Sequence, residues 1–303
     1  GIPPWHSTAF VALLAAITVA HLPSLESLDE IATLDTFTNR VFPDLLTLRT
    51  LAIIRLSIAT VALSLTIYLI LGEGWQVYAN YKPQSRLRRE FIRLKGLGTL
   101  CPFTSWCWCF LGFSFLFNGV IALAVDQGQA DRVEPWMLRT AIVLWEVSSP
   151  FALLVSTVIK YAIWPVVLAG GKPHNLAGFR NQMQHNFNSI FSLVEVALLG
   201  GIKVNFKHLS LATMVGIIYI LFTWIMAPLY YGNKTVGPQY LYFFMDTTLG
   251  TTTTLALIAL LVALTAFFGI FAGIEMLIEA IAGTLWTKIM FVVVLSGVVC
   301  KFR

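Results

Sequence analysis

Charged side chains are scarce in this chain. Asp, Glu, Lys and Arg make up only 12% of its 303 residues, which is about half of their share in an ordinary soluble domain. Hydrophobic residues make up 57%, and the mean hydropathy is +0.78. Because a soluble protein of this size needs a polar surface, the composition indicates an integral membrane protein. It also excludes a disordered chain and a secreted disulfide scaffold.

Cysteines and several catalytic motifs are also scarce or absent. Of the four cysteines, Cys107 and Cys109 form a C-x-C pair without the second pair that a zinc site needs, so we expect reduced thiols. The chain has no G-x-S-x-G, which excludes an α/β-hydrolase. It has no H-E-x-x-H, no histidine cluster and no glycine-rich phosphate loop. We therefore expect neither a metal ion nor a cofactor.

The net charge of +5 does not indicate a nucleic-acid partner, because the basic residues lie between apolar runs. Basic segments of this kind orient a membrane protein, with most Lys and Arg on the cytoplasmic or matrix side. Residues 73–100 form the most basic stretch. We expect them to be a loop at the membrane surface that contacts anionic lipid.

Long apolar runs dominate the chain and are continuous rather than alternating, which indicates helices and not a β-barrel. The longest runs cover residues 50–72, 101–125, 137–164, 208–229 and 243–272, with shorter runs at 8–22 and 280–300. We therefore expect an all-α, polytopic transmembrane helix bundle with about seven spans (six to eight). The chain shows no internal repeat, which disfavours an inverted-repeat transporter. The composition fits a multi-pass protein of an endomembrane or mitochondrial membrane.

A row of polar residues interrupts one further apolar helix, between residues 181 and 195. Successive members are spaced 4, 3, 4 and 3 residues apart, which keeps them on one helical face. These residues, called the polar stripe below, are Asn181, His185, Asn188, Ser192 and Glu195. Because each unpaired polar group costs roughly 2–3.5 kcal/mol at membrane depth, the stripe is expected to face the bundle interior.

The polar stripe has three possible roles. It can be a hydrogen-bonding network that packs helices together. It can also line a reaction or ligand site, or an ion or proton path. A hydrolytic site would need a hydroxyl or thiol within reach of His185 as the base, and the residue pattern alone selects no nucleophile.

The order of these segments resembles the androgen-induced/FAR-17a family of membrane proteins. That family carries a helix of the form N-H-x-x-H-(x9)-E, which Asn181, His185 and Glu195 match in register. The sequence Gly216-Ile-Ile-Tyr-Ile-Leu-Phe-Thr-Trp224 is similar to the family's following span, and Pro102-Phe-Thr-Ser-Trp106 is similar to the opening of an earlier one. The resemblance covers about residues 50–275.

The resemblance implies a domain organisation and a chemistry. Residues 50–275 would form a six-helix membrane core, preceded by a short apolar segment and amphipathic loop (1–49) and followed by an apolar extension (276–303). Members of the family are intramembrane threonine hydrolases that cleave fatty acid esters of hydroxy fatty acids. By position, Thr104 would be the nucleophile and His185 its base.

The remaining stripe residues would bind or orient the substrate. Asn181 would orient the His185 ring or donate to the oxyanion, and Asn188, Ser192 and Glu195 would line an acyl-sized pocket. Membrane lipids are then the expected partners. The alternative interpretation is a non-catalytic integral membrane subunit that binds lipid or holds other membrane-protein subunits together.

Overall fold

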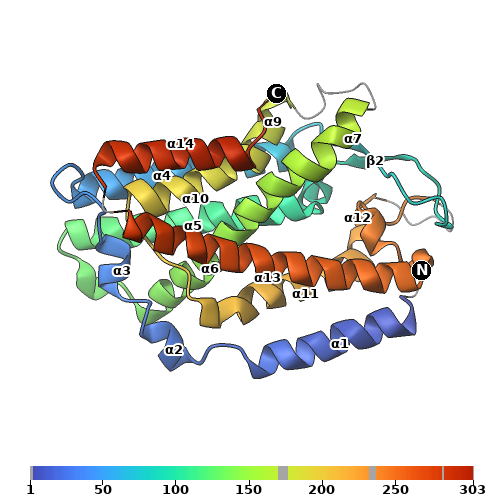
Figure 1. The fold of residues 1–303 in the computed structure, drawn as a ribbon, viewed down its shortest axis with the longest axis horizontal. Helices are drawn as coiled ribbons and strands as arrows, with labels where there is room; N and C mark the ends of the chain where they lie inside the picture. Colours follow the sequence, from blue (N-terminus) through green and yellow to red (C-terminus); the bar gives the residue numbers. More distant parts are fainter. Residues whose placement is uncertain (1–2, 170–176, 232–236, 282, 303) are drawn as a thin grey trace. The chain divides into compact units, whose positions relative to one another are not determined.

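The computed structural model describes residues 3–169, 177–231, 237–281 and 283–302 (Figure 1). It is 74% helical, which confirms the all-α class. By contact, the chain divides into two compact units. Unit 1 comprises Gly1–Leu22, Thr66–Trp106 and Leu209–Thr265. Unit 2 comprises Pro23–Leu65, Cys107–His208 and Ala266–Arg303. The three segments implied by the family resemblance stay a prediction, since this division groups residues by contact alone.

Among the described residues, five helical segments are long and apolar enough to cross a membrane, as an integral membrane protein requires. They are α4 (Leu48–Leu71), α5 (Phe103–Asp126), Pro135–Val166, Phe206–Ile225 and α13 (Thr251–Ala280). The apolar helices α1 (Trp5–Ala20) and α14 (Leu285–Val299) have only 16 and 15 residues. The predicted count of about seven spans is therefore not confirmed.

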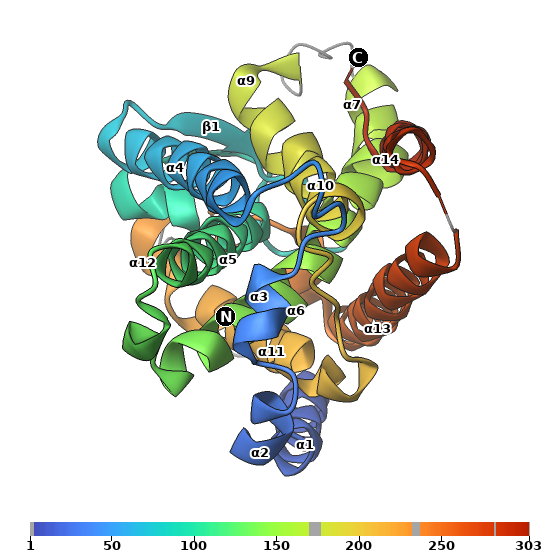
Figure 2. The same ribbon diagram turned by 90° about the vertical axis from the view of Figure 1, so that its left-hand side faces the viewer.

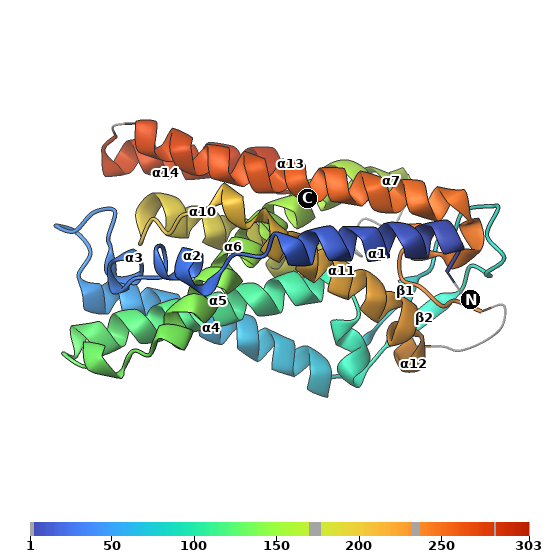
Figure 3. The same cartoon turned by 90° about the horizontal axis from the view of Figure 1, so that it is seen from below.

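Unit 1 is built around α1 and α11 (Leu209–Ile225), which pack against each other (Figure 3). Buried residues from both helices join one apolar cluster with residues of α13 and of a β-hairpin. The hairpin pairs β1 (Trp75–Tyr78) with β2 (Phe91–Leu94) in antiparallel register. Short helices complete the unit: η1 (Gly96–Leu100), α12 (Ala227–Tyr231), η6 (Phe243–Met245) and η7 (Thr247–Leu249).

The hairpin corrects the expectation that residues 73–100 are a plain loop. Gly74 adopts φ +74° before β1, where a Cβ atom would lie 2.0 Å from the Leu94 carbonyl oxygen. After β1, the buried Tyr81 hydroxyl donates to the Tyr240 carbonyl at 2.5 Å, and burial raises its pKa to about 12. These contacts tie a basic but ordered segment to the rest of unit 1.

Unit 2 is centred on α6 (Pro135–Val158), which packs against α2 (Leu25–Asp29) and α10 (Asn188–Leu198). Helix α10 also lies along α14, as Figure 2 shows. Pro150 lies inside α6 without ending it, as helices in a membrane bundle allow. The unit also contains shorter elements: α3 (Leu34–Thr38), η2 (Ala130–Arg132), η3 (Ile159–Ile163), α7 (Trp164–Ala169), α9 (Phe179–Gln182), η4 (Met183–Phe187) and η5 (Phe206–His208).

The position of the hairpin relative to a membrane can be tested by labelling. Arg88 in the loop of the hairpin and Gln127 are both exposed. In the chain, Arg88 precedes α5 and Gln127 follows it. If α5 crosses the membrane, a membrane-impermeant maleimide should reach Arg88→Cys from the cytoplasmic or matrix side and Gln127→Cys from the other side. Labelling of Arg88→Cys only from the non-cytoplasmic side would contradict the orientation.

Candidate functional site

The polar stripe lies on a helix that is not α-helical throughout. Helix α9 ends at Gln182, a π-helical turn covers Met183–Phe187, and α10 begins at Asn188. A π-turn breaks the regular backbone hydrogen-bond pattern and often occurs at functional sites. The turn contains His185, the proposed base.

All five stripe residues are buried, as their spacing predicts. Asn181 and His185 are 8% and 9% exposed, whereas Asn188, Ser192 and Glu195 are fully buried. The opposite face of the helix is only partly buried and is apolar. The helix therefore turns its polar side toward the protein.

Serine side chains contact the middle of the stripe, although the buried Asn188 Nδ2 has no hydrogen-bond partner among the described residues. The Ser156 hydroxyl of α6 contacts the His185 carbonyl oxygen and lies 3.1 Å from Asn188 Oδ1. Asn188 Oδ1 also accepts the Ser189 backbone N–H at 2.7 Å, and Ser192 donates to the Asn188 carbonyl at 3.0 Å. The Ser156 contacts connect α6 to α10, so Asn188 contributes to helix packing, whereas the Ser192 hydroxyl is bonded within α10.

Glu195 is held by a buried cation, which is Arg55 of α4. Arg55 Nη2 lies 2.5 Å from Glu195 Oε1, and Arg55 Nε donates to Oε2 at 3.1 Å. Both side chains are fully buried. The bidentate geometry satisfies both carboxylate oxygens, so Glu195 is not available to line a pocket as the sequence suggested.

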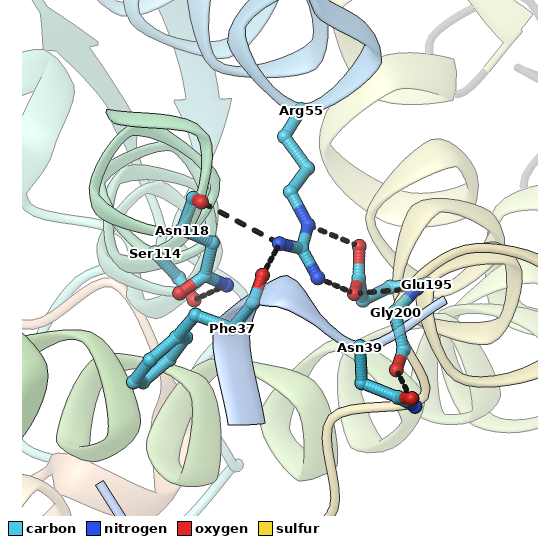
Figure 4. Close-up of polar contacts among 7 residues, drawn as sticks. All are labelled: Phe37, Asn39, Arg55, Ser114, Asn118, Glu195 and Gly200. Carbon is cyan, nitrogen blue, oxygen red and sulfur yellow. Dashed lines mark hydrogen bonds and ion pairs between the residues drawn. The ribbon is translucent and has the colours of Figure 1, made fainter. Parts of the chain in front are cut away.

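Backbone groups complete the surroundings of this ion pair (Figure 4). Arg55 Nη1 donates to the carbonyl oxygens of Phe37 at 2.5 Å and Asn118 at 3.4 Å. The Gly200 N–H donates to Glu195 Oε1 at 3.1 Å. The guanidinium thus faces acceptors on both sides, and the pair joins α3, α4, α5 and α10.

The sequence analysis did not identify Arg55 as the partner of Glu195. The available signal was that Arg55 is the only charged residue between 50 and 72. An arginine inside such a run requires an anion or several acceptors. Which anion it meets depends on a contact between residues 140 positions apart.

Thr104, the expected nucleophile, lies in the first turn of α5 and belongs to unit 1, whereas His185 belongs to unit 2. Thr104 is partly exposed, which a nucleophile requires. Nearby, burial raises the pKa of the Cys101 thiol to about 12, so this cysteine stays a protonated, unreactive thiol. The four cysteines are free, as expected.

A surface depression of about 450 Å³ lies in unit 2, but no stripe residue lines it. Its walls come from the α3 region and from the segment after α10. The lining residues are Ile31, Asp35, Thr36, Thr38, Asn39, Gly200, Gly201, Ile202 and Lys203. Within the described ranges, no three His, Cys, Asp or Glu side chains gather as a metal-binding group. The acyl-sized pocket along the stripe stays a prediction.

Comparisons with known protein families, with curated proteins and with solved structures found no significant match. The resemblance to the androgen-induced/FAR-17a family therefore rests on the residues of the chain itself.

Removing one partner of the Arg55–Glu195 pair should lower the stability of the protein more than replacing both partners with apolar residues. Arg55→Met or Glu195→Gln should each lower the stability by about 3–5 kcal/mol, because each leaves the other partner's charge poorly matched inside unit 2. The double replacement Arg55→Met, Glu195→Leu should cost less than the two single changes together. Thermal unfolding of the purified protein in detergent measures all three, and strict additivity would contradict the pairing.

Gly200 should not tolerate a side chain. A Cβ atom at this position would lie 1.9 Å from Arg55 Nη2 and 2.5 Å from Glu195 Oε1. Gly200→Ala should therefore lower the unfolding temperature by several degrees. Gly273→Ala is the matched control, because a Cβ atom there meets nothing within 4 Å. Equal unfolding temperatures for the two variants would show that Gly200 has no such packing role.

Proposed function

We propose that the chain is an integral membrane hydrolase of lipid esters, with Thr104 as the nucleophile and His185 as its base. The expected substrates are fatty acid esters of hydroxy fatty acids. The observation that supports this most directly is the state of His185. Its side chain is buried, and within the described ranges its ring makes no hydrogen bond, although its backbone carbonyl does. Burial keeps such an imidazole neutral, and a base must be neutral before it can take the proton of a nucleophile.

The chemistry requires only these two groups and water. Thr104 Oγ1 would attack the ester carbonyl while its proton passes to His185. The carbon–oxygen bond to the hydroxy fatty acid would then break, and His185 would return the proton to the leaving alcohol. Water, activated in the same way, would release the fatty acid. The two side chains must come within about 3 Å of each other, directly or through one water.

Asn181 lies about one turn before His185 on the same helix face. It would orient the imidazole or donate to the developing oxyanion. The hydrolase would be a multi-pass protein of about seven spans in an endomembrane or mitochondrial membrane. Its partners would be membrane lipids.

A second candidate is a non-catalytic membrane subunit that binds lipid or holds other subunits. The observation that favours it is the bonding of the stripe. Asn188, Ser192 and Glu195 all have structural partners in unit 2, as expected for a helix-packing network. Asn181 Oδ1 likewise accepts a hydrogen bond from Arg180 Nη2 at 3.0 Å.

Activity of variants distinguishes the two candidates. Thr104→Ala and His185→Ala should each reduce hydrolysis of a long-chain fatty acid ester of a hydroxy fatty acid by at least about 100-fold. The double variant should be little worse, because residues that act as one unit are not additive. Purified protein in detergent is assayed for fatty acid release.

Thr60→Ala and His21→Ala are the matched controls, because both side chains are exposed and hydrogen-bond only within their own helices. Both should keep full activity. If either Thr104→Ala or His185→Ala keeps most of the activity, or if the two losses multiply, the pair does not act as nucleophile and base. If the wild-type protein releases no fatty acid, the non-catalytic candidate is favoured.

A further inference from the structure

Three side chains from distant parts of unit 2 meet in the order Ser, His, Glu. Ser27 lies on α2, Glu146 on α6, and His208 at the end of η5. The Ser27 hydroxyl is 3.2 Å from His208 Nε2. His208 Nδ1 is 2.7 Å from Glu146 Oε2. None of the three belongs to the polar stripe.

Both carboxylate oxygens of Glu146 have hydrogen-bond partners. Glu146 is completely buried, and His208 is 1% exposed. The second carboxylate oxygen, Oε1, accepts the Asn205 backbone N–H at 2.9 Å. The His208 backbone N–H donates to the Asn205 carbonyl at 2.9 Å, so the turn that carries His208 wraps around the carboxylate. Glu146 therefore holds the His208 imidazole through Nδ1.

This arrangement selects one tautomer of the imidazole. A carboxylate at Nδ1 favours the proton on that nitrogen, which leaves the lone pair of Nε2 facing the Ser27 hydroxyl. The same connectivity, with the acid on Nδ1 and the hydroxyl on Nε2, occurs in Ser-His-acid hydrolases on unrelated folds. It is recognised by geometry and not by sequence position.

Ser27 is the accessible member of the group. It is partly exposed, while its base and acid are buried. The Ser24 hydroxyl caps α2 by accepting the Ser27 backbone N–H at 3.1 Å, which fixes the start of the helix. Leu25 and Phe206, each two residues from a member of the group, are 61% and 54% exposed. Apolar surface beside a nucleophile suits an acyl chain.

We propose that Ser27, His208 and Glu146 form a hydrolytic centre for long-chain carboxylic esters, separate from Thr104 and His185. The losses of about 100-fold expected for Thr104→Ala and His185→Ala therefore apply in a Ser27→Ala background, in which this second centre releases no fatty acid. Ser27 Oγ attacks the ester carbonyl and passes its proton to His208 Nε2. The ester carbon–oxygen bond breaks, and the leaving alcohol takes that proton. A water molecule then attacks the acyl-serine, gives its proton to His208, and releases the fatty acid as Ser27 is re-protonated. Glu146 holds the imidazole and stabilises its protonated form throughout.

The competing interpretation is a structural ion pair in which His208 stays protonated. Nε2 would then donate to Ser27, and the hydroxyl would not be activated. The two interpretations differ in the reactivity of Ser27, which a phosphonofluoridate probe with a long alkyl chain measures. Its phosphorus–fluorine bond breaks as Ser27 Oγ bonds to phosphorus, and only an activated hydroxyl reacts rapidly.

The experiment uses the full chain in detergent and maps the modified residue by peptide mass spectrometry. We expect modification of Ser27, its loss in Ser27→Ala, and a rate at least about 100-fold lower in Glu146→Gln, which disturbs the imidazole tautomer. Ser210→Ala is the control, since its partly exposed hydroxyl only donates to the His21 carbonyl. It should react like the wild type.

Labelling of the wild-type protein before and after heat denaturation gives a measurement that does not depend on the folding of a variant. Only the folded protein should be modified at Ser27, because activation of the hydroxyl requires the assembled group. Modification at Thr104 alone would overturn this proposal and leave the Thr104 proposal standing. Modification at neither residue, or of Ser27 at a rate unaffected by Glu146→Gln, would overturn it as well.

Discussion

The ion pair of Arg55 and Glu195 is the constraint on which unit 2 depends. Both charges are fully buried, and an unpaired charge in that position would cost several kcal/mol. Each charge therefore makes the other necessary. Arg55 also needs the carbonyl groups of Phe37 and Asn118, and Glu195 needs the Gly200 N–H. One guanidinium thus determines how α3, α4, α5 and the end of α10 come together.

The polar stripe follows from the same constraint. Glu195 sets which side of α10 faces the protein, and the residues one and two turns before it must then be satisfied inside unit 2. Ser156 of α6 meets this need by contacting both the His185 carbonyl and Asn188. The π-turn before α10 shifts His185 out of the regular helical bonding. The contact of His185 with Ser156 is made by its backbone carbonyl and not by its ring.

Local features of the chain were predictable from sequence, and long-range contacts were not. The apolar runs predict the first and last residues of α4 and α5 to within about two residues. They do so because a spanning helix must satisfy its backbone hydrogen bonds internally. The spacing of the stripe predicts its burial. The β-hairpin was missed because its strands are only four residues long and lie in a basic segment. The partner of Glu195 was missed because it lies 140 residues away. The partners of His208 were missed because they lie 62 and 181 residues away.

Burial of a charged or titratable group does not by itself mark a reactive site. Whether such a group is reactive depends on its hydrogen-bond partners. Glu195 has a cation and a backbone donor on its oxygens, so its charge is already compensated inside the protein. Glu146 is equally buried, but its partner is an imidazole whose second nitrogen contacts a partly exposed hydroxyl. A proton can move along that contact, whereas no proton can move through Arg55. By this criterion the two buried carboxylates have different roles: Glu195 holds helices together, and Glu146 positions a base.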